Sequence, residues 1–146
     1  MKLFRRILHP TDFSKASGLA FKTALELARQ ERAELRLVYV IAPPAVLVED
    51  SFLTAKTWAE MTSAGRREAQ RRLGPLLARA KKAHVRASAA VLEGVAFEEI
   101  VREARRRRAD LIVVGTHGRT GVARFFLGSV AARVLALARC PVLTVR

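Results

Sequence analysis

Two glycine-containing segments near the end of the chain carry the residue types of a phosphate-binding loop. Gly115-Thr116-His117-Gly118 directly follows an apolar run, and Gly128-Ser129 comes after nine intervening residues. A phosphate can accept hydrogen bonds from several backbone N–H groups only where no Cβ blocks its approach, and glycine has no Cβ. The hydroxyl of Ser129 can cap a helix that starts there or bond a phosphate oxygen. The pattern therefore predicts phosphate binding.

The spacing of these glycines distinguishes the segment from other nucleotide-binding motifs. Neither G-x(4)-G-K-[ST] nor G-x-G-x-x-G has a match in the chain. The spacing Gly-x(2)-Gly-x(9)-Gly-Ser is that of the ATP-binding branch of the universal stress protein family, which the chain resembles. Residues 7–14 (ILHPTDFS) are similar to that family's first strand and loop, and residues 140–145 (CPVLTV) to its last strand. The resemblance covers the whole chain.

This resemblance implies a fold, a function and a set of binding residues. The implied fold is a doubly wound, Rossmann-like α/β fold: a five-stranded parallel sheet of order 3-2-1-4-5 with helices on both faces. The implied function is that of an ATP-binding stress-response protein, a nucleotide-dependent switch or chaperone-like regulator without a dedicated catalytic activity. Mg²⁺ would be held mainly through the phosphates. The binding residues carried over are Pro10, Thr11, Asp12, Val40, Gly115, Thr116, His117, Gly118, Arg119, Gly128, Ser129 and Val130.

Several of these residues keep a second interpretation. Asp12 either caps the helix after the first strand or, as the resemblance implies, binds the ribose or the metal–phosphate side of ATP. His117 is either a solvent-facing loop residue or a phosphate ligand. Arg119 and Arg124 either neutralise phosphates or are merely exposed. Val40 is a core residue on composition alone, whereas the resemblance implies contacts to adenine.

Hydrophobic periodicity arranges the chain as alternating strands and helices. We expect strands at residues 3–8, 35–41, 85–92, 111–114 and 142–145, and helices at 16–28, 59–83, 97–104 and 128–138. Gly74 and Pro75 are expected to kink or interrupt the second helix, which follows a long connection over residues 42–58. The alternation predicts a mostly parallel sheet covered on both faces.

The implied strand order places the ligand where that order reverses, between strands one and four. The loops that follow these strands are residues 10–12 and 115–128, which are the segments that carry the motif. Topology and motif therefore point to the same end of the sheet. The first expected strand ends at Pro10, so His9 belongs to it and is expected to be a packed residue.

Length and composition predict one domain over residues 1–146. Cys140 is the single cysteine, so no intrachain disulfide can form. No apolar run approaches a length of about 18 residues and no signal peptide is evident, which predicts a cytoplasmic protein without a membrane partner. The apolar last strand lies at the sheet edge in the implied order, and it predicts a homodimer through that strand.

The formal net charge of +14, from 27 basic and 13 acidic residues, raises the question of nucleic-acid binding. The basic residues recur on helical segments, as in residues 105–108, which favours solvated helix faces or complements to helix C-termini. No aromatic residues are interleaved with them, so a nucleic-acid site is the less favoured alternative. A slow ATPase or phosphotransferase assisted by Asp12 or His117 is the other alternative.

Overall fold

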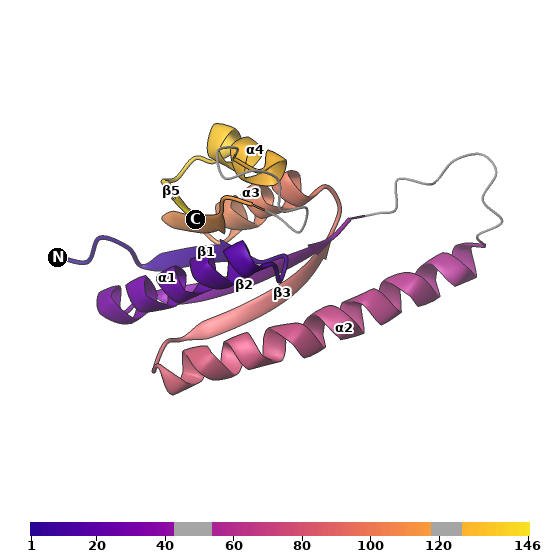
Figure 1. Cartoon of the computed structure of the whole chain (residues 1–146), viewed down its shortest axis with the longest axis horizontal. Helices are drawn as coiled ribbons and strands as arrows, with labels where there is room; N and C mark the ends of the chain where they lie inside the picture. Colours follow the sequence, from indigo (N-terminus) through magenta and orange to yellow (C-terminus); the bar gives the residue numbers. More distant parts are fainter. Residues whose placement is uncertain (43–53, 118–126) are drawn as a thin grey trace.

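The structure is a computed structural model that describes residues 1–42, 54–117 and 127–146. Strands and helices alternate along the described chain (Figure 1) in the order β1 (Arg6–Pro10), α1 (Lys15–Glu31), β2 (Glu34–Ile41), α2 (Ala55–Lys82), β3 (Ala87–Glu93), α3 (Ala96–Arg106), β4 (Leu111–Gly115), α4 (Ser129–Leu137) and β5 (Val142–Val145). None of the described helices is both long and apolar enough to cross a bilayer.

All strand pairs in the sheet are parallel, and their order is β3-β2-β1-β4-β5. This confirms the predicted doubly wound α/β fold and its strand order. β1 is central, with Leu8 opposite Arg36 of β2 on one side and opposite Ile112 of β4 on the other. The first residue of β1 therefore lies at the amino end of the sheet, and its last residue lies at the carboxyl end.

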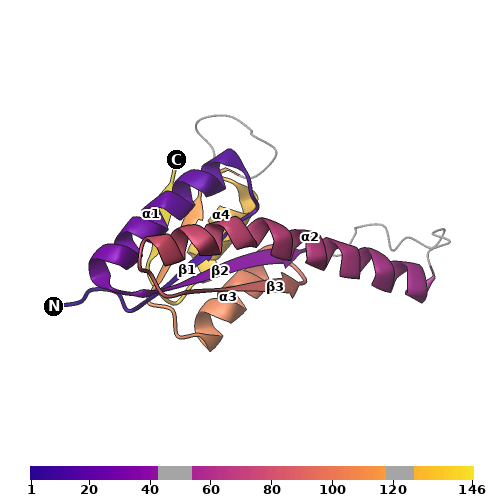
Figure 2. The same ribbon diagram turned by 90° about the horizontal axis from the view of Figure 1, so that it is seen from below.

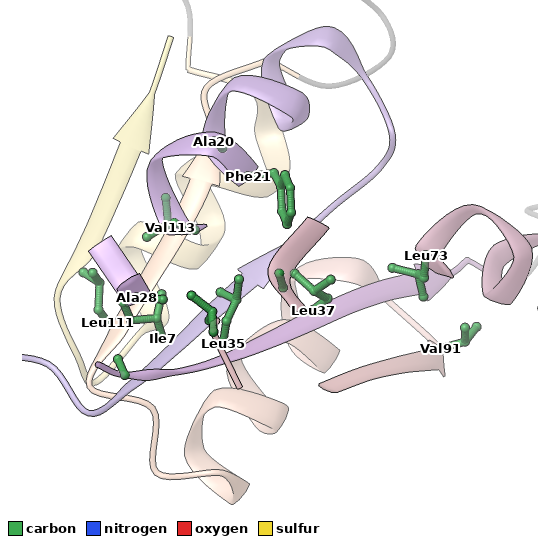
Figure 3. Close-up of a cluster of buried hydrophobic side chains, with 14 of the residues drawn as sticks. Ile7, Ala20, Phe21, Ala28, Leu35, Leu37, Leu73, Val91, Leu111 and Val113 are labelled. Atoms are coloured by element: carbon green, nitrogen blue, oxygen red, sulfur yellow. The ribbon is translucent and has the colours of Figure 1, made fainter. Parts of the chain in front are cut away.

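Each face of the sheet is covered by two helices. α1 and α2 pack on one face through a cluster that includes Phe21 and Leu73 (Figure 3), and α3 and α4 pack on the other through Ile100 and Val134 (Figures 1 and 2). The central strands are buried on both sides, which explains their nearly continuous apolar runs. α1 and α4 therefore lie on opposite faces although they follow neighbouring strands.

β1 starts three residues later than predicted, because the backbone before Arg6 bonds to side chains instead of to a strand. The carboxylate of Glu31 accepts from the N–H of Leu3 at 2.7 Å. The carboxylate of Asp110 accepts from the N–H groups of Arg5 and Arg6 at 2.9 and 3.0 Å. These bonds hold the N-terminal segment against the sheet end without extending the strand.

Of the predicted kink or interruption of the second helix, the interruption was wrong: α2 is a single element that contains Pro75 and begins inside the predicted connection. Proline costs one backbone hydrogen bond there. Leu73 before it and Leu76 and Leu77 after it nevertheless pack on the same core cluster. We attribute the unbroken helix to this shared packing, because tertiary contacts outweigh a local helix-breaking signal.

His9 is fully buried in β1, as predicted for a packed residue. The only role open to the carbonyl of Val113 is to accept, so Nδ1 of His9 carries the proton and donates to it at 2.8 Å. The Nε2 atom is buried and has no hydrogen-bond partner among the described residues. Burial lowers the pKa of His9 to about 4, against the opposing effects of the Val113 bond and the charge of Asp12. His9 is therefore neutral in the folded protein.

We predict that acidification from pH 7 to pH 5 destabilises the protein through His9. The folded pKa of about 4 lies below the unfolded value of about 6.5, so the unfolded chain binds the proton first. The contribution of neutral His9 to the free energy of unfolding is complete above about pH 6.5, and it is lost as the pH falls toward 4. The loss at pH 5 is about 2 kcal/mol, measured as the free energy of unfolding in urea at the two pH values.

The variant His9→Asn keeps an N–H donor near Val113 but has no titrating ring, so it should show a pH-dependent loss smaller by that amount. The exposed His84 provides the control, since His84→Asn should retain the wild-type loss. An unchanged pH dependence in His9→Asn would contradict the assignment.

Candidate functional site

A cavity of about 340 Å³ opens at the carboxyl ends of β1 and β4, where the strand order reverses. Ten of the twelve predicted binding residues line it, namely Pro10, Thr11, Asp12, Val40, Gly115, Thr116, His117, Gly128, Ser129 and Val130. The other two, Gly118 and Arg119, lie outside the described residues, as does Arg124. The two sequence segments that were expected to meet therefore share one cavity wall.

Sequence reasoning missed an apolar part of this wall. Tyr39 and Val38 contribute from β2, and Ile100 contributes from α3. Tyr39 was detectable in principle, because it adjoins Val40 at the carboxyl end of a strand next to β1. Ile100 was not, since it is far from the motif in sequence and its position follows only from the packing of α3 on this face.

Hydrogen bonds within the β1–α1 loop fix its polar side chains. The hydroxyl of Thr11 accepts from the Phe13 N–H at 3.1 Å and from the Ser17 hydroxyl at 2.7 Å. Asp12 Oδ1 accepts from the Ser14 N–H at 2.9 Å. The N-cap of α1 is Ser14, whose hydroxyl accepts from the Ser17 N–H at 3.2 Å. The capping interpretation of Asp12 was therefore wrong: Asp12 closes the turn before the helix.

Phe13 turns the chain between Asp12 and α1 in a left-handed conformation, with φ 62°. A residue with a Cβ is disfavoured there by about 1 kcal/mol or more. Aromatic and cationic neighbours hold its ring, since the Tyr39 ring lies 5.0 Å away and the Arg72 guanidinium lies 4.3 Å above it. This packing offsets the backbone cost and fixes the turn beside the cavity.

The N-terminus of α4 forms the opposite part of the wall. Its N-cap is Gly128, and no side chain of the described residues makes a capping hydrogen bond there. Ser129 is the first helical residue, so the expected capping role of its hydroxyl was wrong. Ser129, Val130 and Ala131, which carry the first amide groups of the helix, all line the cavity. A helix N-terminus has a partial positive charge and free N–H donors, so this part of the wall suits an anion.

Thr116 and His117 continue the wall from the end of β4. Thr116 is buried, and its hydroxyl lies 2.8 Å from Nδ1 of His117. Its carbonyl accepts from the Gly128 N–H, which joins the two ends of the motif. No group of three His, Cys, Asp or Glu side chains in the described parts of the chain is arranged to hold a metal ion. Asp12 is the carboxylate among the described residues of this wall.

Gly115 has a structural role that the sequence did not show. A Cβ at this position would lie 2.9 Å from the carbonyl carbon of Ala16 and 3.0 Å from the backbone nitrogen of Ser17. The first turn of α1 therefore rests directly on the end of β4. This glycine permits the two cavity-lining segments to approach each other, whatever the ligand.

A model of the Universal stress protein family matches residues 3–146 of the chain. The sequence is 38% identical over 146 residues to Universal stress protein MJ0531 of Methanocaldococcus jannaschii, covering 99% of this chain and 83% of that protein. The solved structure of MJ0577 from the same organism has a TM-score of 0.87 at 26% identity, covering 98% of this chain and 96% of that one. A universal stress protein crystallised in complex with cAMP has a TM-score of 0.73 at 25% identity, covering 99% and 98%.

We predict that Gly115→Ala destabilises the fold by about 1–3 kcal/mol, the usual cost of forcing a methyl group into a packed site. The clash is with backbone atoms, so a whole helical turn must move to relieve it. The control is Gly18→Ala in α1, where an added Cβ meets nothing within 4 Å and helix propensity favours alanine. Chemical denaturation should show a loss for the first variant and no loss for the second. Equal stability of both would refute the close approach.

Proposed function

The chain belongs to the universal stress protein family, and we propose that it binds ATP and acts as a nucleotide-dependent switch or chaperone-like regulator in the stress response. The observation that carries the proposal is the convergence of β1, β2, β4 and α4 residues on one cavity at the reversal point of the sheet. A structural neighbour crystallised in complex with cAMP supports an adenine nucleotide as the ligand.

The chemistry of the wall supports one orientation of this nucleotide. Val40 and Ile100 form an apolar part that suits adenine, and the uncapped N-terminus of α4 suits the phosphates. Asp12 and Thr11 lie on the loop after β1, where they can meet the ribose or the metal–phosphate side. A volume of about 340 Å³ falls at the lower end of the range for small-molecule sites.

Asp12 fits the proposed Mg²⁺, because this ion keeps several waters and is bound through one or two carboxylates together with substrate phosphates. One carboxylate on the wall is therefore enough, provided that the phosphates supply the remaining ligands. A bound Mg²⁺ would neutralise phosphate charge next to the α4 N-terminus. The proposal assigns to the chain's residues the binding and orientation of the nucleotide, and it assigns no catalytic residue.

We also propose that the protein forms a homodimer through β5. This strand pairs with β4 on one side and ends the sheet on the other. Leu143 on β5 is exposed, as are Leu135 and Leu137 on α4, the helix that precedes this strand. A free strand edge favours pairing with another strand, and two copies related by a two-fold axis satisfy each other.

We predict that Ser129→Asp weakens ATP binding at least about tenfold, because the added carboxylate repels the phosphates. An acidic residue in the first helical turn stabilises a helix, so the fold should be kept. The matched control Ser129→Asn is neutral and nearly the same size, and it should bind ATP like wild type. Calorimetric titration of ATP with Mg²⁺ measures both affinities.

Adenosine provides a second measurement, because it has no phosphate groups. Its affinity should not change in Ser129→Asp if the phosphates of ATP lie at α4. Saturating ATP should also stabilise the wild-type protein by about 2.7 kcal/mol at a hundredfold excess over the dissociation constant. Equal ATP affinity in the Asp and Asn variants would place the phosphates elsewhere. The absence of any stabilisation by ATP, ADP or AMP would refute the nucleotide proposal.

We predict that Thr144→Pro converts the dimer to a monomer. The carbonyls of Pro141 and Val145 accept from β4, so alternation along the strand directs the backbone groups of Val142 and Thr144 to the open edge. Proline at 144 removes an outward N–H and leaves the ladder to β4 intact. Thr144→Val keeps this N–H and should stay dimeric in light scattering. A monomeric wild type at tens of micromolar would contradict the dimer.

A further inference from the structure

A second cavity, of about 420 Å³, lies at the amino ends of β1 and β2, beside the end of α3. Its lining includes Arg6, Arg36, Arg106, Arg107 and Arg108, and we refer to it as the arginine cavity. Arg6, Ile7 and Leu8 of β1 line the arginine cavity, whereas Pro10 at the other end of the same strand lines the cavity at the carboxyl ends of the strands. They are two separate places in the fold.

A buried carboxylate organises three of these arginines. Glu103 is 2% exposed, and its carboxylate accepts from Arg36 Nε at 3.0 Å, Arg106 Nη2 at 2.6 Å and Arg107 Nε at 3.2 Å. Burial alone would raise the pKa of Glu103, but the hydrogen bonds from Arg106, Arg36 and Arg107 outweigh it and lower the pKa. Glu103 is therefore ionised and fixes three guanidinium groups around one negative charge.

The positive charge of this cavity exceeds what Glu103 neutralises. Glu34 is the carboxylate among the described lining residues, and the carboxylates of Glu103 and Asp110 lie beside the lining, so five arginines are accompanied by three carboxylates. Guanidinium groups held this close repel one another, and a bound anion of more than one charge relieves the repulsion.

Helix-end electrostatics explain only part of the cluster. Arg106, Arg107 and Arg108 lie at the C-terminus of α3, where cations complement the helix dipole. Arg36 belongs to a strand, and its side chain is only 13% exposed. It also donates to the Ser88 hydroxyl at 3.0 Å, so its position is fixed from two sides.

Arg108 follows α3 in a left-handed conformation, as Arg32 does at the end of α1 and His84 does at the end of α2. Its φ of 52° is left-handed, at a position where helices favour glycine. The residue type is therefore not the one that the backbone prefers. An arginine here places a further cation on the cavity lining.

We propose that the arginine cavity is a second anion site that binds a small phosphate compound with at least two negative charges, such as a pyrophosphate group. Guanidinium forks match phosphate oxygens in pairs, and Arg is suited to this bidentate contact. Because Glu103 already orders three of the arginines, little side-chain entropy remains to be lost on binding. The proposal is independent of the nucleotide cavity.

Calorimetric titration with pyrophosphate tests the site in wild type and in the double variant Arg6→Gln/Arg108→Asn. These two residues line the cavity but do not hold Glu103, and asparagine tolerates the left-handed backbone. The matched control is Arg86→Gln/Arg105→Gln, which removes two exposed arginines at the same end of the sheet and outside the cavity lining. We expect at least a tenfold loss of affinity, about 1.4 kcal/mol, in the first double variant and less than about threefold in the control.

Pyrophosphate binding should persist in Ser129→Asp, which separates this site from the nucleotide cavity. Loss in Ser129→Asp together with retention in Arg6→Gln/Arg108→Asn would assign the binding to the nucleotide cavity and overturn the proposal. The absence of binding to wild type at millimolar pyrophosphate would also overturn it. A short DNA duplex is the third probe: binding tighter than that of pyrophosphate, and weakened equally in both double variants, would replace the cavity by a nucleic-acid surface spread over this end of the molecule.

Discussion

The cavity in which we propose that a nucleotide binds depends on the position of β1 between β2 and β4 in a parallel sheet. The chain leaves β1 toward the face that carries α1, and it leaves β4 toward the face that carries α4. The helices that follow these two neighbouring strands therefore lie on opposite faces of the sheet, and the cavity opens at the carboxyl ends of the strands. The close contact of Gly115 with the first turn of α1 fixes one side of this opening. The strand order and this contact therefore determine the shape of any ligand site at this end of the sheet.

The two ends of the sheet would attract anions by different physical means. At the carboxyl end, the uncapped start of α4 offers backbone amides and a partial positive charge. At the amino end, helices present their C-termini, which carry partial negative charge, so positive charge there must come from side chains. Arg36 and its neighbours provide it, with Glu103 as the charge that orders them. The excess basic charge of the chain is therefore concentrated in part on the end away from the nucleotide cavity.

The strand order and the shared cavity could be predicted because they follow from strong signals. Apolar runs and helical periodicity located the elements, and the glycine spacing supported the family from which the order followed. The exact helix limits could not be predicted in the same way. Asp12 and Ser14 are both good N-cap residues, and only the geometry after Phe13 decides that Ser14 is the cap. Pro75 signalled a break, but packing on both sides of it decided the outcome.

The glycine motif led to the cavity through the expectation that its glycines make room for a phosphate, but this expectation explains only part of their role. Gly115 is needed because the backbone of α1 occupies the space where its side chain would be. Gly128 has φ −57°, which other residues also adopt, so its backbone angle does not require glycine. A glycine after a strand therefore indicates that another group comes close to the backbone at that position. This group can be a helix of the protein itself, as it is at Gly115, and need not be a ligand. The N-terminus of α4 and the cavity beside it therefore favour a bound ligand more strongly than the glycines alone do.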